Sequence, residues 1–133
     1  MRPSVNPKRE GERGSAAVEF ALVLPLILVM ILVVVEVGLL VKDQILLEES
    51  ARAGAREAAV TTDDQQVSQA VFDAAVSLDQ TRIDVTVARE DGVGSPVTVT
   101  VTYQAPVDIP LVAWLLPASI DLSGKAVMRQ ETA

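Results

Sequence analysis

The chain has 133 residues, which is enough for one modest domain with an anchor but not for two separate cores. It contains neither cysteine nor histidine, which excludes disulfides, thiol nucleophiles, the commonest metal ligands and the usual general base. The net charge of −7 combines a leader of net charge +2 at residues 1–14 with a body of −9. The acidic body argues against a nucleic-acid partner, because phosphates attract clustered lysine and arginine side chains.

The first predicted element is a membrane span. Residues 20–41 form a run of 22 residues in which Glu36 is the only polar side chain. As a helix the run is about 33 Å long, close to the roughly 30 Å hydrocarbon core of a bilayer. Because the basic leader precedes this run and the acidic body follows it, we expect one span with the N-terminus inside and the C-terminal domain outside.

Three kinds of N-terminal segment could produce such a run. A secretory signal peptide has a shorter apolar region followed by an A-x-A-like site, but the nearest such site, Ala51-Arg52-Ala53, lies inside a charged helical pattern. A plain signal anchor accounts for every feature except Gly14 and Glu19, the fifth residue after that glycine. A pilin-type N-terminus accounts for these two residues as well.

The stretch R-G-S-A-A-V-E-F at residues 13–20 resembles the processing site of type IV pilin-like proteins. In those proteins a prepilin peptidase cuts after a glycine, and a glutamate is the fifth residue of the mature chain. The resemblance implies a cut between Gly14 and Ser15, after which Glu19 meets the N-terminal amine of a neighbouring subunit. Such a pair would set subunit register, since a lone carboxylate at an apolar edge is costly to desolvate. The alternative is a solvated glutamate that the helix dipole favours.

Further segments narrow the resemblance to TadE-like proteins, the pseudopilins of the Flp (tight adherence) pilus system. These segments are G-S-A-A-V-E-F-A-L-V-L-P at 14–25, V-E-V-G at 35–38 and S-A-R-A-G-A-R-E-A-A at 50–59. The sequence departs from that family at Val37, where an aromatic residue is common, and at Leu39, where a basic residue often follows. The resemblance implies a type IVc pilus assembly component of the bacterial cytoplasmic membrane, acting in pilus initiation or assembly for adhesion. Its partners would be a prepilin peptidase, other pilins or pseudopilins and pilus assembly proteins, and incorporation into an extracellular fibre stays open.

Three further side chains are candidate contact residues on the long helix. Intramembrane acids usually mark a partner or a pathway, so Glu36 either contacts another subunit within the membrane or reaches the outer interface beside Lys42. Arg52 and Arg56 form a basic stripe at i, i+4 spacing. This stripe is either a solvated face or a docking surface for an acidic partner subunit.

The sequence predicts that the long helix covers residues 15–60 and that an α+β domain follows at residues 61–133. Apolar residues on one face predict a second, amphipathic helix: Val67, Ala70, Val71, Ala74, Ala75 and Leu78. Alternating runs at 83–88 and 97–103 predict an antiparallel hairpin, and 121–128 predicts a third strand of the sheet. The apolar stretch 108–117 is either a cover for the core or a contact patch anchored by Trp114.

No residues in the outer domain form a catalytic constellation, so we expect no enzyme, cofactor, metal site or small-molecule substrate. The favoured function is that of a non-enzymatic pilus component whose leader, residues 1–14, is removed. The alternative is an uncleaved single-pass protein with an extracytoplasmic domain that binds a ligand or partner. A third hypothesis, a soluble domain released by signal peptidase, predicts a much smaller product.

Overall fold

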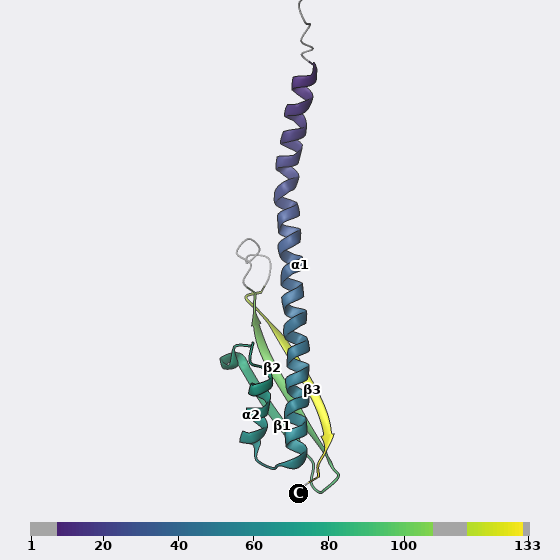
Figure 1. The fold of residues 1–133 in the computed structure, drawn as a ribbon, viewed down its shortest axis with the longest axis vertical. Helices are drawn as coiled ribbons and strands as arrows, with labels where there is room; N and C mark the ends of the chain where they lie inside the picture. Colours follow the sequence, from purple (N-terminus) through teal and green to yellow (C-terminus); the bar gives the residue numbers. More distant parts are fainter. Residues whose placement is uncertain (1–7, 108–116, 132–133) are drawn as a thin grey trace, which may run out of the picture. The chain divides into compact units, whose positions relative to one another are not determined.

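The computed structural model describes residues 8–107 and 117–131, with side chains described from Gly14 onward. The chain divides into two compact units, Met1–Val35 and Glu36–Ala133. The described elements, in chain order, are α1 (Lys8–Val60), α2 (Asp64–Ala74), a 3-10 turn η1 (Gln80–Arg82), β1 (Ile83–Arg89), β2 (Pro96–Pro106) and β3 (Ser119–Arg129) (Figure 1). This arrangement confirms the predicted α+β class with a long apolar helix, a second helix and a three-stranded sheet.

In the N-terminal unit, α1 presents an apolar surface from Phe20 to Val35. The helix continues through Pro25, whose ring removes one backbone hydrogen bond. Its large apolar side chains are exposed within the unit, as Leu22, Leu26 and Met30 illustrate. The segment is long and apolar enough to cross a membrane, and none of its most apolar stretch is buried by other parts of the chain. The protein is therefore a single-pass membrane protein by the character of this helix.

The C-terminal unit is built on a sheet with the strand order β1-β2-β3 and antiparallel neighbours throughout. In the register, Val85 faces Val101 across the first pair of strands and Val101 faces Gly124 across the second. The predicted hairpin between β1 and β2 is confirmed. Its turn uses Gly92 and Gly94, both of which have positive φ angles that side-chain-bearing residues rarely adopt.

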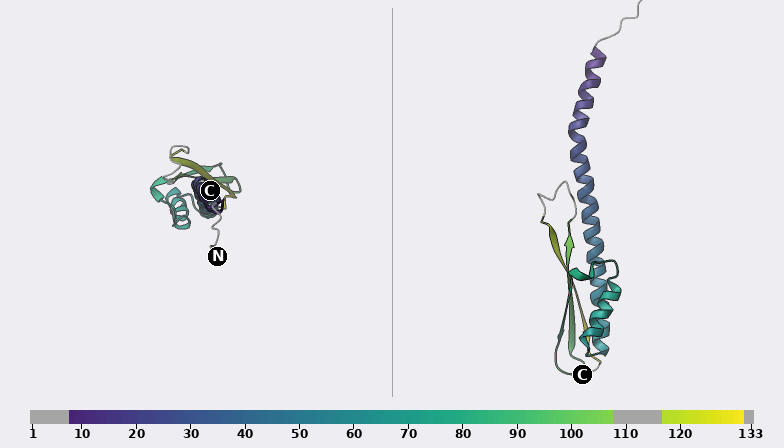
Figure 2. Two further views of the ribbon diagram at one scale, coloured as in Figure 1. Left: turned by 90° about the horizontal axis from the view of Figure 1, so that it is seen from above. Right: turned by 90° about the vertical axis from the view of Figure 1, so that its left-hand side faces the viewer.

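The outer half of α1 and helix α2 lie on the same side of this sheet (Figure 2). The core joins residues from both helices and from the sheet: Leu47, Ala51 and Ala55 of α1, Val67 and Val71 of α2, and Val97, Val99 and Val101 of β2. All the core residues in β2 belong to one face, which matches the period-two pattern of its sequence. The opposite face of β2 carries threonines at alternating positions.

Small residues allow the helices and the sheet to approach closely. A Cβ atom on Gly54 would lie 2.5 Å from Val71 Cγ2, so α1 and α2 approach each other closely at this glycine. On the sheet side, a Cβ atom on Gly124 would lie 2.6 Å from the backbone oxygen of Leu47. These two glycines let α1 pack against a helix and a strand at once.

Helix α2 is shorter than its apolar pattern predicts. It ends at Ala74, and the Ala75 N–H donates to the carbonyl oxygens of Val71 and Phe72 as the helix stops. Ala75 and Leu78 are nevertheless buried, because the following turn keeps both side chains on the core. The predicted core face is therefore confirmed, and only the length of the helix was wrong.

Candidate functional site

The predicted processing site lies on the described part of α1. Gly14 is exposed, and a Cβ atom placed on it would have no neighbour within 4 Å. One residue further, the Ser15 hydroxyl donates a hydrogen bond of 3.1 Å to Glu19 Oε1, one helical turn away. Glu19 is exposed and forms no ion pair with any side chain that the structure describes. Its carboxylate is therefore available to a positively charged group from another molecule.

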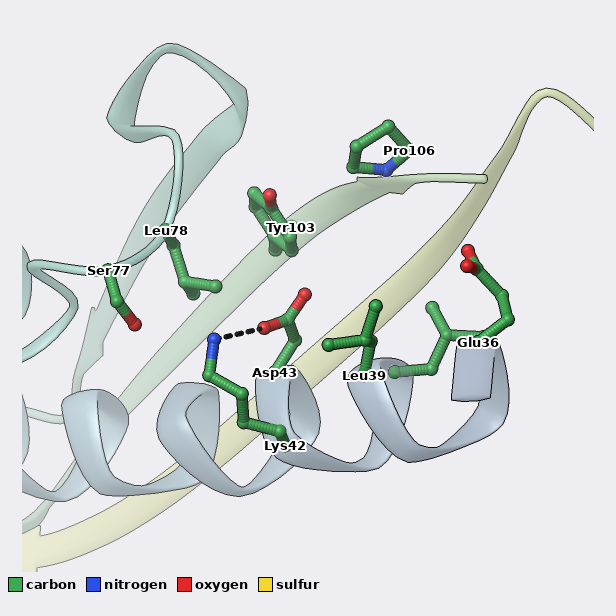
Figure 3. A pocket seen from close by; sticks show the side chains of 9 residues that line it. Glu36, Leu39, Lys42, Asp43, Ser77, Leu78, Tyr103 and Pro106 are labelled. Atoms are coloured by element: carbon green, nitrogen blue, oxygen red, sulfur yellow. Dashed lines mark hydrogen bonds and ion pairs between the residues drawn. The ribbon is translucent and has the colours of Figure 1, made fainter. Parts of the chain in front are cut away.

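The second predicted residue, Glu36, lines a hollow of about 220 Å³ in the C-terminal unit (Figure 3). Residues of α1, the loop after α2 and strand β2 form its walls; the polar ones are Glu36, Lys42, Asp43, Ser77 and Tyr103, and the apolar ones are leucines with Pro106. Glu36 is half-buried and has no hydrogen bond or ion pair to a described residue. The hollow therefore brings together side chains from three separate parts of the fold.

The contact that the sequence suggests between Glu36 and Lys42 is replaced by another. Lys42 Nζ lies 3.4 Å from Asp43 Oδ1, so its ion pair is with the next residue (Figure 3). The Asp43 side chain is mostly buried while that of Lys42 is exposed, and both residues line the hollow. The Glu36 carboxylate is consequently left without a counter-ion among the described residues.

The basic stripe on α1 is exposed. Arg52 Nη2 lies 3.3 Å from Glu48 Oε2 at i, i+4 spacing, and both side chains are about half exposed. Arg52 and Arg56 also line a shallow hollow of about 320 Å³ with Glu49 and Ala53. A surface ion pair of this kind contributes about 0–1 kcal/mol to stability. Stabilisation of the fold by this pair therefore does not explain the basic stripe. Trp114, the predicted anchor of a contact patch, lies outside the described residues.

The contacts of two important side chains were not predicted from the sequence. Tyr103 was assigned only to the buried face of a strand, but it also lines the hollow beside Glu36. Arg89 ends the inward-facing series of β1, where its Nη1 donates to the Ala58 carbonyl oxygen and its Nη2 to Asp64 Oδ1, both at 2.8 Å. Because successive side chains of a strand point to opposite faces, Arg89 lies on the core side of β1. A positively charged residue at a core-facing position indicates that it has a partner there, and this indication was present in the sequence.

The chain was compared with models of protein families. Residues 14–56, about a third of the chain, match the model of the family described as TadE-like protein. The matched range begins at Gly14 and includes Glu19, Glu36, Arg52 and Arg56. Neither a curated protein nor a solved structure matches the chain. Over residues 14–56 the chain is therefore similar to TadE-like proteins, and this range includes most of the helix that is long and apolar enough to cross a membrane.

Proposed function

We propose that the protein is a pseudopilin-like component of the Tad pilus assembly machine, acting in pilus initiation or assembly for adhesion. In this proposal a prepilin peptidase removes residues 1–14, and the mature protein begins at Ser15. The observation that supports it most is the TadE-like match starting at Gly14, with an exposed glutamate five residues further on. Its partners are other pilins or pseudopilins in the cytoplasmic membrane, and its C-terminal unit faces outward.

The Gly14–Ser15 bond lies within α1, which begins at Lys8. A peptidase that binds an extended substrate must therefore unwind this part of the helix. Glycine weakens a helix by about 0.5–1 kcal/mol relative to alanine. Gly14 consequently makes local unwinding easier at the bond that we propose is cut, and its open surroundings leave the backbone accessible.

Cleavage would change the role of the Glu19 carboxylate. In the uncut chain this group accepts a hydrogen bond from the Ser15 hydroxyl. A cut before Ser15 creates an ammonium group one helical turn from Glu19, and we propose that Glu19 pairs with the corresponding ammonium of a neighbouring subunit. Because two such groups in an apolar environment are stable only when they meet, the pair fixes the axial register between subunits.

Intact mass tests processing directly. Co-expression of the full chain with a cognate prepilin peptidase should yield a product that begins at Ser15. The Gly14→Ala variant should keep its full mass, whereas the control Gly38→Ala should be cut. Both glycines lie in α1 with open space around a Cβ atom, so steric disruption is the same in the two variants. An uncut wild-type chain beside an active peptidase would instead support the alternative, an anchored domain that binds a ligand or partner.

The role of Glu19 requires a second measurement on the processed protein. The Glu19→Gln variant should still be cut at Gly14 but should lose co-purification with its partner subunits. Asp121→Asn is a suitable control, because Asp121 is an exposed acid on strand β3, outside α1 and the basic stripe. If both variants retained their partners equally, the proposed register pair would be wrong while processing would stand.

A further inference from the structure

The two edge strands of the sheet, β1 and β3, direct alternate backbone groups away from β2. In an antiparallel pair, successive residues of one strand point their N–H and C=O groups alternately toward the partner strand and away from it. At the end of β3, the Gln130 N–H donates to the carbonyl oxygen of Ser95, which precedes β2. The even-numbered residues of β3 therefore pair with β2, and the odd-numbered ones direct their backbone groups to the outer edge of the sheet.

Contacts from α1 cover part of the β3 edge. Gln44 Nε2 donates to the Ser123 carbonyl oxygen at 3.0 Å. Beyond the strand, the Glu131 N–H donates to the Ala59 carbonyl oxygen at 2.7 Å. Lys125 lies between these contacts and is exposed, and a lysine on an edge strand opposes pairing with other chains. The fold thus protects this edge of the sheet against an additional strand.

The β1 edge has no such cover from the described residues. The Glu90 N–H donates to the Pro96 carbonyl oxygen, so the even-numbered residues of β1 pair with β2 and the odd-numbered ones face the outer edge. Val85 and Val87 each direct an N–H and a C=O group to this edge. None of these four groups forms a hydrogen bond to a residue that the structure describes. The middle of β1 therefore presents a row of open donors and acceptors.

β1 also lacks the features that usually prevent strand addition. All seven residues from Ile83 to Arg89 pair with β2 in one uninterrupted register, so the strand has no bulge, and it contains neither proline nor lysine. Its inward-facing cation, Arg89, is already bound to α1 and to Asp64. The side chains of Val85 and Val87 are only partly buried. An added strand would satisfy the open backbone groups and cover these two side chains with its own apolar residues.

The charge around β1 indicates which strand would fit. Residues 79–91 contain four acids and two arginines, which gives a net charge of −2. Arg82 and Arg89 both pair with aspartates of this chain. Asp84 is exposed on the outer face of β1 and forms no ion pair with a described residue. Because opposite charges on neighbouring strands attract, a strand with lysine or arginine beside Asp84 is favoured.

We infer that the open edge of β1 binds an extended basic segment of a partner protein, which adds a fourth strand to the sheet. The segment alternates apolar residues, which lie beside Val85 and Val87, with lysine or arginine residues on the outer face beside Asp84. Main-chain hydrogen bonds supply the affinity in this mode of binding, and the alternate side chains supply the specificity. The site lies in the C-terminal unit and depends neither on processing at Gly14 nor on the proposed role of Glu19.

Amide hydrogen exchange of the full chain in neutral detergent micelles tests this inference. Without a partner, the Val85 and Val87 amides should exchange quickly, whereas the Thr86 and Ala88 amides, which pair with β2, should exchange slowly. The probe is the end-blocked peptide K-V-K-V-K-V-K, which should slow the exchange of Val85 and Val87 as its concentration rises. N-methylation of the peptide's valines removes the donors that an antiparallel strand directs at β1 and should abolish this protection. N-methylation of its lysines, on the opposite edge, should not.

Two variants of the protein separate backbone pairing from charge. Val87→Pro removes a donor from the open edge but no hydrogen bond to β2. It should abolish the protection of Val85 by the peptide while the β2 amides stay protected. Asp84→Asn should weaken binding of the peptide by roughly two- to fivefold, the effect of one exposed ion pair. The control Asp121→Asn, an exposed acid of β3, should leave binding unchanged.

Three results would overturn the inference. Slow exchange of Val85 and Val87 without peptide, at every protein concentration, would mean that the edge is already covered within the chain. Protection that rises with protein concentration instead would assign the edge to a second copy of this chain. Equal protection by the acidic peptide E-V-E-V-E-V-E, or none by the basic one, would exclude a basic strand as the partner. Each of these results leaves the proposed processing at Gly14 unaffected, because intact mass measures it separately.

Discussion

The two compact units share helix α1 but obtain their stability in different ways. Up to Val35 the large side chains are exposed, and the helix satisfies its own backbone hydrogen bonds while a membrane supplies the apolar surroundings. From Glu36 onward the helix buries a stripe of small residues against α2 and the sheet. A surface that is apolar on every side therefore suits contact with lipid chains. A narrow stripe of small residues suits close packing against fixed elements of the same chain.

The difference explains where large and small residues occur. The membrane segment carries bulky leucine, isoleucine and valine on every side, because lipid chains adapt to any shape. The outer segment places Ala51, Gly54 and Ala55 at its contacts and a single large residue, Leu47, in the core. The same substitution should consequently have a large effect on stability in one unit and little effect in the other.

Truncation of a leucine gives the largest expected contrast. Leu47 is fully buried, and Leu47→Ala should lower the free energy of unfolding of the outer domain by about 2–5 kcal/mol. Leu28→Ala, in the exposed membrane segment, should leave the same quantity unchanged. Hydrogen exchange of the β2 amides, measured on the full chain in detergent micelles, reports this unfolding without interference from the membrane helix. Equal effects of the two variants would contradict the division into two units.

A glycine substitution sharpens the comparison within the outer unit. A Cβ atom on Gly124 would lie 2.6 Å from Leu47 O and 2.8 Å from Leu47 C, which are backbone atoms that cannot rotate away. Gly124→Ala should therefore destabilise the domain by about 1–3 kcal/mol. The control Gly38→Ala has open space and should be neutral or slightly stabilising, because alanine favours the helix. Thermal unfolding followed by the same amides would show whether strand β3 separates from α1.

The third contrast concerns the end of α1. Arg89 donates to the Ala58 carbonyl oxygen and to Asp64, and the Glu131 N–H donates to the Ala59 carbonyl oxygen. A helix leaves its last carbonyl oxygens without partners, and these contacts supply them from β1 and from the chain after β3. Arg89→Ala should cost about 1–3 kcal/mol, the penalty for an unsatisfied buried acceptor.

The same site offers an internal control for that prediction. The Asp64 side chain is 64% exposed, so Asp64→Ala should have a much smaller effect on the free energy of unfolding than Arg89→Ala. A double-mutant cycle measured by urea titration separates the ion pair from the helix cap. If the two single variants were equally destabilising, the ion pair rather than the Ala58 carbonyl would be the important contact.

Local sequence patterns were sufficient to predict the helices and strands but not the contacts between them. The apolar run, the face containing Val67 and Val71, and the alternation in β1 and β2 each reflect one periodic segment. The end of α2 could not be placed, because Ala75 and Leu78 stay buried through a turn and continue the helical pattern.

The hollow beside Glu36 depends on long-range packing. Its walls come from α1, the loop after α2 and β2, and no spacing in the sequence links Glu36 to Tyr103. The pair of Lys42 with Asp43 was missed because adjacent residues on a helix do not share a face, whereas long side chains at its surface can still meet. The proposed processing motif, by contrast, is local, because it consists of Gly14, Glu19 and the apolar run that follows them in the sequence.

The smallest predicted effect is a pH dependence confined to the loop before β1. The Asp79 carboxylate accepts hydrogen bonds from the Thr81 hydroxyl at 2.6 Å and from the Thr81 N–H at 3.0 Å. These bonds, together with the neighbouring Arg82, hold the pKa of Asp79 below its ordinary value of 3.8. Because the unfolded chain takes up the proton first as the pH falls, Asp79 contributes stability above that value. The contribution is lost as the pH falls through the lower pKa of the folded state.

The difference in stability between the wild type and Asp79→Asn should therefore be constant at neutral pH and shrink below pH 3.8. Thr81→Ala removes the hydroxyl donor, so the pKa of Asp79 should move back up, and its contribution should be smaller and should be lost completely at a higher pH. Urea unfolding of both variants across the acid range would show the shift. An unchanged difference down to the lowest pH would mean that Asp79 keeps the same pKa in the folded and unfolded chains, and that its hydrogen bonds to Thr81 do not favour the charged form.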